Sequence, residues 1–194
     1  GGYEFGLVKI PTNEETPIVF SQPTDVRFSY GTSKFMSEFL FRQFGEKYDT
    51  SLTIIRYHNI YGPRMGLRHV IPELITRLKN GENPLIVYGA NETRAFCHIS
   101  DATEATRKIA LCDTVNQNII HIGNQYEEIT IKDLANKIIR LMKLDVKIKE
   151  SVGRSGSVSR RCPDTNKLKK ATGFQAKIDI IEGLEDSIKW YMNN

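Results

Sequence analysis

Segments in which apolar residues recur at the helical period alternate along this chain with segments that have the pattern of a strand. A helix-period run over residues 30–48, with Phe35, Met36, Phe39 and Phe44 among its members, predicts a largely buried helix. The β-branched run over residues 52–58 predicts a strand buried on both faces. Further runs predict strands at 85–88, 93–99, 118–122 and, half-exposed, 146–149, and helices at 69–79, 100–112, 131–142, 166–172 and 180–191.

Two of these helices begin at residues typical of helix caps. Ser100 precedes the helix at 100–112 with Glu104 near the reciprocal position, and Thr130 precedes the helix at 131–142 with Asp133 three residues on. Residues 1–28, with three prolines, and the Asn59–Pro63 stretch are expected to be loops. Strands that alternate with helices throughout imply an α/β fold with crossover connections.

Composition narrows the class of protein. The 194 residues are 40% hydrophobic and 26% charged, which suits a globular protein with its own core. No run of eighteen apolar residues occurs, so we expect no membrane span. The net charge of +4 comes from scattered lysines and arginines, which favours a small anionic ligand over a nucleic acid. Three cysteines without paired spacing favour reduced thiols, a cytoplasmic location and no metal site.

Tyr30 and Lys34 are the first candidates for chemistry. A helix through both would place them on one face, one turn apart. A free phenol loses its proton at about pH 10, and an ammonium held beside it favours the phenolate. Such a tyrosine can accept and return a hydroxyl proton. The alternative is an exposed tyrosine and lysine whose spacing arose by chance.

Other candidates are Asn59 and several arginines. Asn59 follows a predicted strand, where ligands bind in parallel sheets, although a turn asparagine would look the same. Arg94 stands in an apolar strand and must be paired if buried; its planar donor fork suits a diphosphate or a structural ion pair. Arg154, Arg160 and Arg161 flank a Gly/Ser-rich stretch that we expect to be a flexible anion-binding lid.

Six motifs stand in an order that resembles one enzyme family. They are Tyr30-x-x-x-Lys34, Arg56-Tyr-His-Asn59-Ile-Tyr-Gly-Pro63, His69-Val-Ile-Pro72, Val87-Tyr-Gly89, Thr93-Arg-Ala-Phe-Cys-His-Ile-Ser-Asp101, and Arg154-Ser-Gly with Asp164 after seven more residues. From about residue 30 onward the chain resembles the extended short-chain dehydrogenases/reductases of the NAD-dependent epimerase/dehydratase family. These enzymes act on nucleotide sugars and include UDP-glucose 4-epimerases, UDP-glucuronate decarboxylases and dTDP-glucose 4,6-dehydratases.

The resemblance implies a fold and a function. It implies the C-terminal part of a Rossmann-type parallel sheet in residues 1–66, and mainly a smaller α/β nucleotide-sugar lobe in residues 67–194, with some segments returning to the sheet. The activity implied is transient oxidation of a nucleotide sugar at C4 by bound NAD, with a UDP-sugar 4-epimerase favoured over a decarboxylase or a 4,6-dehydratase. It also implies a homodimer through the helix that carries Tyr30 and Lys34, where Phe35, Phe39 and Phe41 would pack.

The resemblance also implies a role for each matching residue. Tyr30 would be the catalytic acid/base, and Lys34 would favour its ionised form and hold the nicotinamide ribose. The cofactor and substrate contacts implied are Tyr57 at the nicotinamide, Asn59 at the cofactor and the substrate diphosphate, His69 and Val70 at the pyrophosphate and base, Ile86 and Tyr88 at the base, and Arg94, Arg154 and Arg161 at the diphosphate.

Two features of the family pattern are missing. These residues contain no Gly-rich dinucleotide fingerprint, and Ser157 stands where many epimerases carry an acid that contacts the nucleotide ribose. We therefore expect roughly the C-terminal 60% of such a protein, with the catalytic Ser/Thr in a segment before Gly1. By itself the chain is expected to bind NAD poorly and to be inactive, which leaves a nucleotide-sugar-binding module as the alternative function.

Overall fold

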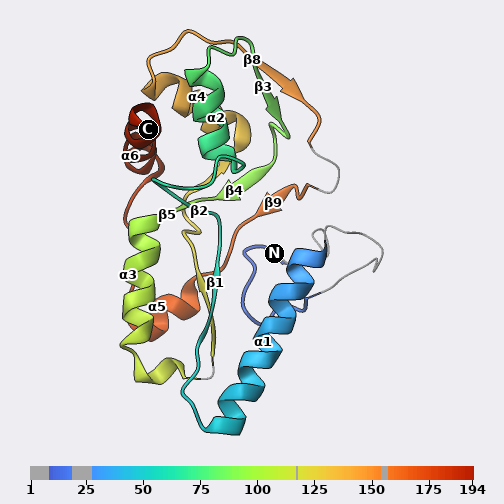
Figure 1. Cartoon of the computed structure of the whole chain (residues 1–194), viewed down its shortest axis with the longest axis vertical. Coiled ribbons are helices and arrows are strands. Elements are labelled where there is room, and N and C mark those ends of the chain that lie inside the picture. The colour runs from blue at the N-terminus through green and yellow to red at the C-terminus, as the bar shows by residue number, and fades with distance from the viewer. Residues whose placement is uncertain (1–8, 19–27, 117, 154–156) are drawn as a thin grey trace.

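Two halves, joined by short extended strands, make up the computed structural model of this chain (Figure 1). The structure describes residues 9–18, 28–116, 118–153 and 157–194. The lower half of Figure 1 holds α1 (Phe28–Tyr48), β1 (Ile54–Tyr57), α3 (Ile99–Ala110), a 3-10 turn (Asp113–Val115), β6 (Ile119–Ile122) and α5 (Asn166–Thr172). The upper half holds α2 (Val70–Lys79), β3 (Leu85–Tyr88), α4 (Ile131–Leu141), β8 (Ile148–Ser151) and α6 (Ile180–Asn193). No helix in the described ranges is long and apolar enough to cross a membrane.

The lower half is built on a parallel pair of strands. β1 and β6 run side by side with Ile54 opposite Ile119 and Tyr57 opposite Ile122. α1 lies on one side of this pair, and α3 and α5 lie on the other (Figure 1). Ile120 and Ile122 are fully buried against apolar side chains of α3 and α5, because alternate residues of a strand point to one face. Parallel pairing of this kind confirms the expected α/β fold.

Short strands connect the halves. β2 (Ile60–Tyr61) pairs in parallel with β5 (Cys97–His98). β4 (Thr93–Ala95) lies between β7 (Glu128–Thr130), which is antiparallel to it, and β9 (Arg160–Arg161), which is parallel to it. The register of β4 and β9 places Arg94 opposite Arg161, so two cations meet in this sheet.

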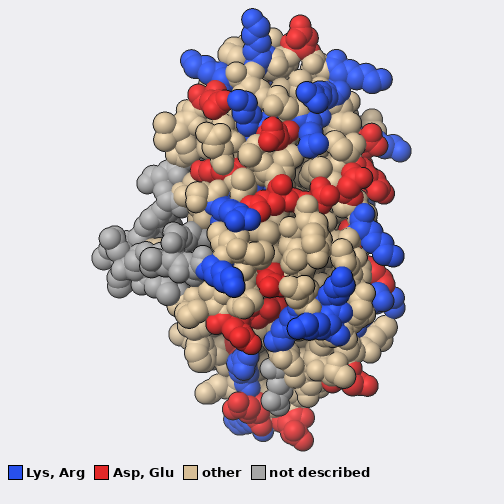
Figure 2. Space-filling model, turned by 180° about the vertical axis from the view of Figure 1, so that it is seen from behind, with Lys and Arg blue, Asp and Glu red and all other residues tan. Residues whose placement is uncertain are grey.

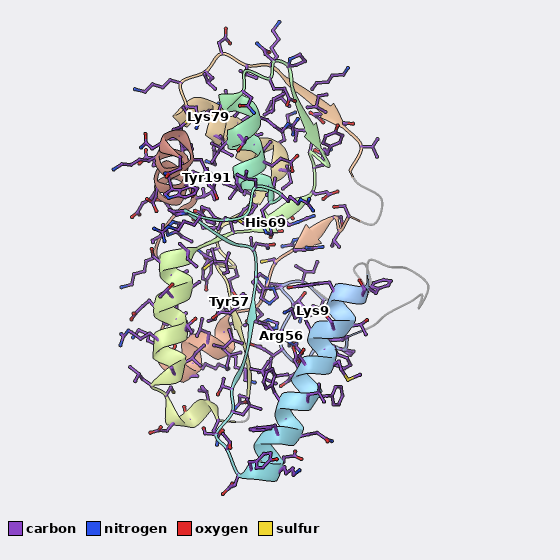
Figure 3. All side chains as sticks on the ribbon, viewed as in Figure 1. Lys9, Arg56, Tyr57, His69, Lys79 and Tyr191 are labelled. Atoms are coloured by element: carbon purple, nitrogen blue, oxygen red, sulfur yellow. The ribbon has the colours of Figure 1, made fainter. Side chains whose placement is uncertain are left out.

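The upper half packs three helices against each other beside the β3–β8 pair. The apolar stripes of α2 and α4 supply Ile71, Ile75, Leu134 and Ile138, all at most 1% exposed. The Lys79 ammonium donates to the carbonyl oxygens of Tyr191 and Met192 at 3.0 and 3.3 Å, and the Tyr191 hydroxyl donates to the Met65 carbonyl at 2.6 Å (Lys79 and Tyr191 are labelled in Figure 3). A cation at the end of α6 complements the partial negative charge of its last carbonyls.

The burial of the first helix was predicted wrongly. α1 occupies the expected residues, but of its members only Gly31 and Gly45 are buried. Phe39, Leu40 and Phe44 are 53%, 64% and 56% exposed, because α1 packs one face on the strand pair and leaves the other outside. β1 also differs from a strand buried on both faces, since Tyr57 is 53% exposed.

The strand expected at 93–99 is two strands in the structure. The Phe96 N–H donates to the Glu127 carbonyl and the Cys97 N–H to the Asn59 carbonyl, so the chain changes partners between Ala95 and Cys97. The cap predicted for the next helix was also wrong. α3 begins at Ile99, and the His98 side chain is its cap, with Nδ1 accepting from the Ser100 N–H at 3.4 Å.

Three other segments differ from expectation. β2 forms at residues 60–61 within the expected loop, and β9 at residues 160–161 within the expected flexible lid. The strand expected at 146–149 lies at Ile148–Ser151, because its register with Leu85–Tyr88 begins at Ile148. The caps of α4 are as predicted, with the Thr130 hydroxyl accepting from the Asp133 N–H at 3.0 Å.

Candidate active site

Two adjoining cavities lie beside the strands of the two halves. The larger, of about 910 Å³, extends between α1 and β1. The smaller, of about 290 Å³, lies in the upper half under α2, β3 and β4. Asn59, Ile60, Met65, His69 and Arg161 line both, so the two cavities meet at these residues. His69 is labelled at this junction in Figure 3, at the start of α2.

Tyr30 and Lys34 line the larger cavity together. A continuous helix runs through both, and the Lys34 ammonium lies 5.4 Å from the centre of the Tyr30 ring. The predicted placement on one face of a helix is therefore confirmed. Tyr30 is 64% exposed, so its phenol is open to a ligand in this cavity. Its role as acid/base stays a prediction.

Tyr57 points away from this pair. Its hydroxyl lies 2.9 Å from the Thr106 hydroxyl on α3, whereas the preceding Arg56 turns to α1, as Figure 3 shows for the two labelled side chains. Adjacent residues of a strand point to opposite faces, which explains the difference. Although residue 57 borders the larger cavity, the structure does not bring its phenol together with Tyr30.

Asn59 and the start of α2 lie where the cavities meet. Asn59 has a left-handed backbone with φ of 44°, and its side-chain amide donates to the Ala95 carbonyl at 3.0 Å. The expected loop residue is thus tied to β4, with a second amide hydrogen still to donate. His69 and Val70 form the N-terminal end of α2, whose backbone N–H groups carry partial positive charge and favour an anion.

β3 presents Tyr88 to the smaller cavity, with 46% of it exposed, but Ile86 is not among the described residues that line it. The Ile86 N–H donates to Glu82 at 3.0 Å, and its carbonyl accepts from Arg77 at 2.6 Å. Arg77 and Glu82 also form an ion pair that raises the pKa of Arg77 and lowers that of Glu82. The base contact predicted at Ile86 would compete with these bonds if it used the Ile86 backbone.

Arg94 is held in a network that sequence patterns did not reveal. Its Nη1 donates to the Thr93 and Val158 carbonyls, both at 2.7 Å. Its Nη2 donates to the Glu92 carboxylate at 2.7 Å and to the Ser157 hydroxyl at 3.3 Å. Arg94 therefore has the structural ion pair that was one of its two interpretations, while it also lines the smaller cavity. Only Nε remains outside these bonds, so the diphosphate contact stays a prediction.

Arg161 lies beside Arg94 and reaches both cavities. Burial lowers the pKa of its guanidinium, and repulsion from Arg94 lowers it further, while Glu92 acts in the opposite direction. An anion bound between the two arginines would relieve this repulsion. The third predicted arginine, Arg154, lies outside the described residues.

The face of the molecule opposite to that seen in Figure 1 carries charges of both signs. Figure 2 shows lysine and arginine side chains interspersed with aspartate and glutamate over the described part of that face. A nucleic-acid surface would gather its cations into a patch or stripe.

Comparison with known proteins defines the class. The family model described as GDP-mannose 4,6 dehydratase matches residues 4–187. The chain is 34% identical over 197 residues to a UDP-N-acetyl-alpha-D-glucosaminuronate decarboxylase of Bacillus cytotoxicus, covering 96% of this chain and 60% of that protein. It is 31% identical over 164 residues to UDP-glucuronic acid decarboxylase 6 of Arabidopsis thaliana, covering 84% of this chain and 47% of that protein.

Solved structures share the fold. The UDP-glucose 4-epimerase of Thermotoga maritima, solved with UDP-glucose, has a TM-score of 0.86 at 22% identity and covers 98% of this chain and 60% of its own. The dTDP-glucose 4,6-dehydratase of Streptomyces venezuelae, solved with NAD, has a TM-score of 0.83 at 23% identity and covers 98% of this chain and 57% of its own.

The fold is a Rossmann-type α/β fold shared with these epimerase and dehydratase structures, and the family match places the chain among the short-chain dehydrogenases/reductases. The chain belongs to the extended branch of that class, the NAD-dependent epimerase/dehydratase family that acts on nucleotide sugars. It spans about 60% of the length of the decarboxylase that it matches over most of its own length.

Proposed function

We propose that this chain supplies the Tyr–Lys pair and the nucleotide-sugar pocket of a UDP-sugar 4-epimerase. One observation carries the proposal. The cavity beside Tyr30 and Lys34 continues through Asn59 and His69 into a pocket bounded by Arg94 and Arg161. A nucleotide sugar with its diphosphate near the arginines would therefore extend its sugar toward Tyr30.

The residues present fit part of the cofactor. Tyr30 and Lys34 line a cavity that runs along parallel strand β1 and past its carboxyl end, where ligands usually bind in such sheets. They would hold the nicotinamide end, with Asn59 nearby, and bound NAD would reversibly accept hydride from C4 of the sugar. These residues contain no G-x-G-x-x-G sequence for the pyrophosphate. Tyr30 would take the C4 hydroxyl proton and return it to the product.

A decarboxylase is the second candidate, and the relatives favour it. The two curated proteins compared above are UDP-sugar decarboxylases at 34% and 31% identity, whereas a putative UDP-glucose 4-epimerase of Methanocaldococcus jannaschii is 27% identical. Both reactions begin with oxidation at C4. Assays of the complete protein with UDP-glucose and UDP-glucuronate distinguish them, since only decarboxylation releases carbon dioxide.

The catalytic role is tested by Tyr30→Phe in the complete protein. Loss of the phenolic proton should lower kcat by at least about 100-fold while nucleotide affinity is retained. Tyr126→Phe is the matched control, because Tyr126 is a similarly exposed tyrosine, 58% against 64%, and lines neither cavity. Full turnover by Tyr30→Phe would remove Tyr30 from the mechanism. The 194 residues alone should bind UDP and turn over little, which calorimetry and assay of the same sample can check.

A homodimer through α1 belongs to the same proposal. Met36, Phe39, Leu40 and Phe44 expose more than half of their surfaces on this helix, an apolar set suited to an interface. Phe39→Asp should shift the sedimentation of the protein toward the monomer, and Tyr126→Asp should not. A monomeric parent protein would contradict the dimer.

A further inference from the structure

Glu38 is the one carboxylate among the described residues that line the larger cavity. The other charged or basic side chains there are three cations and two imidazoles, those of Lys34, Arg56, Arg161, His58 and His69. The Glu38 side chain is only 16% exposed. A carboxylate largely withdrawn from water needs a cation or hydrogen bonds beside it. The cation that pairs with Glu38 therefore decides which cations of the cavity remain for a different role.

Arg56 is the cation that pairs with this carboxylate. It reaches from β1 to α1 (Figure 3), with Nε 2.8 Å from Oε1 and Nη2 2.7 Å from Oε2 of Glu38. Both carboxylate oxygens are therefore engaged by one planar donor fork, whose geometry matches a carboxylate. A lysine at residue 56 would offer a single point charge instead.

Lys34 is placed to compete for the same carboxylate. It precedes Glu38 by four residues on α1, so the two side chains project from one face of the helix, one turn apart. Opposite charges at this spacing attract each other. The Lys34 ammonium nevertheless lies beside Tyr30, 5.4 Å from the centre of the ring, and the described residues include no ion pair between Lys34 and Glu38.

Arg42 is the other cation one turn from Glu38 on α1. It lines a different cavity of only about 20 Å³ near the end of the helix, together with Glu46. It is not among the described residues that line the larger cavity. Lys34 is therefore the cation of α1 that shares a cavity with Glu38.

We propose that Arg56 is a positioning residue for the catalytic pair: it holds both oxygens of Glu38 and so prevents this carboxylate from drawing the Lys34 ammonium away from Tyr30. The inference rests on the proposed function, since it presupposes that Tyr30 acts as acid/base with Lys34 beside it. In this role Arg56 acts only through Glu38.

The test uses two substitutions that break the same ion pair but leave different groups behind. Arg56→Gln leaves the Glu38 carboxylate to pair with Lys34. The kcat of the complete protein should then fall about tenfold or more, because Tyr30 loses the ammonium that favours its ionised form. Glu38→Gln leaves no carboxylate, so its kcat should fall by less than about threefold. The double variant, with both substitutions, should recover most of the activity lost in Arg56→Gln.

Two further measurements on Arg56→Gln report on Lys34 directly. The lower limb of the pH profile of kcat should move to higher pH, since the Tyr30 phenol then ionises less readily. A crystal structure of this variant should place the Lys34 ammonium within about 4 Å of the Glu38 carboxylate. The kcat of Arg56→Lys, which keeps a cation but frees one carboxylate oxygen, should lie between those of Glu38→Gln and Arg56→Gln.

Arg107→Gln is the matched control. The Arg107–Glu104 pair has the same two-point geometry, with both contacts at 2.8 Å, but neither residue lines either cavity. This substitution should leave kcat unchanged.

Three outcomes would overturn the role of Arg56. One is full activity of Arg56→Gln, which would follow if Arg42 took the carboxylate. Another is equal losses in Arg56→Gln and Glu38→Gln without recovery in the double variant, which is the result of a purely structural ion pair. If Arg56→Gln does not fold, a kcat of Arg56→Lys at or above that of Glu38→Gln contradicts the role as well. Activity that survives Tyr30→Phe would instead contradict the proposed function, and the inference with it.

Discussion

Arg56 on β1 holds the carboxylate of Glu38 on α1 in a two-point ion pair. Nε lies 2.8 Å from Oε1 and Nη2 lies 2.7 Å from Oε2. The two side chains are only 14% and 16% exposed. Because Glu38 follows Lys34 by one helical turn, this pair fixes the helix face that carries Tyr30 and Lys34 against the strand.

Removal of one partner should destabilise the protein. Glu38→Ala leaves the Arg56 guanidinium largely withdrawn from water without this carboxylate, and we expect a loss of about 2 kcal/mol in the free energy of unfolding, measured in urea. Glu104→Ala is the control, since the Glu104–Arg107 pair has similar geometry but is 40% and 59% exposed. Its unfolding curve should hardly move. Equal effects of the two substitutions would show that burial does not decide the strength of these pairs.

Stability should fall in mild acid because of two histidines, His121, which is fully buried, and His58, which is partly buried. Burial lowers the pKa of His58 to about 3 and that of His121 to about 4, from a usual value of 6.5. Their rings lie 4.4 Å apart, so each also disfavours a charge on the other. Arg56 and Arg161 lower the pKa of His58 further; Arg56 and Lys167 lower that of His121, whereas Asp164 and the Thr12 carbonyl raise it.

The direction of the pH effect follows from proton uptake. The unfolded chain protonates these imidazoles as the pH falls through about 6.5, whereas the folded protein does so only near pH 4 and below. The two histidines therefore make their full contribution to the free energy of unfolding above pH 6.5. Below that pH the free energy of unfolding falls by up to about 1.4 kcal/mol per pH unit for each histidine. Urea unfolding at pH 7.5 and 5.0 measures this loss. His58→Gln should reduce the difference, and replacement of the exposed His69 by Gln should not.

Helix capping offers a direct comparison of sequence and structure. Thr130→Ala removes the hydroxyl that caps α4 and should cost about 1 kcal/mol of unfolding free energy. Ser100→Ala should be almost neutral, because His98 caps α3 in its place. Thermal unfolding of both variants measures the difference. A larger loss for Ser100→Ala than for Thr130→Ala would contradict the cap assignments in the structure.

Local pattern was sufficient for most helices and for the Tyr30–Lys34 pair. The helical period depends on residues three and four apart. Local spacing therefore predicted the approximate bounds of five helices, α1, α2, α4, α5 and α6. It also predicted that Lys34 lies close to Tyr30. The same pattern did not report burial. The exposure of Phe39 and Leu40 depends on which other elements pack on α1, and the spacing of residues within the helix does not show that.

The remaining features depend on residues that are distant in sequence. The change of partners at Phe96, the strand at Arg160–Arg161 and the cap of α3 by His98 follow from backbone groups that meet only in the folded sheet. The contact between Glu92 and Ser157 had no signal in the sequence, because the two residues are 65 positions apart. The sequence alone determined the order of the helices, the family motifs and the placement of Tyr30 and Lys34 on one helix face, since these rest on short spacings. Only the tertiary structure decided the cavity and the position of Glu92 in it, because strand register sets which distant side chains share a charge or a hydrogen bond.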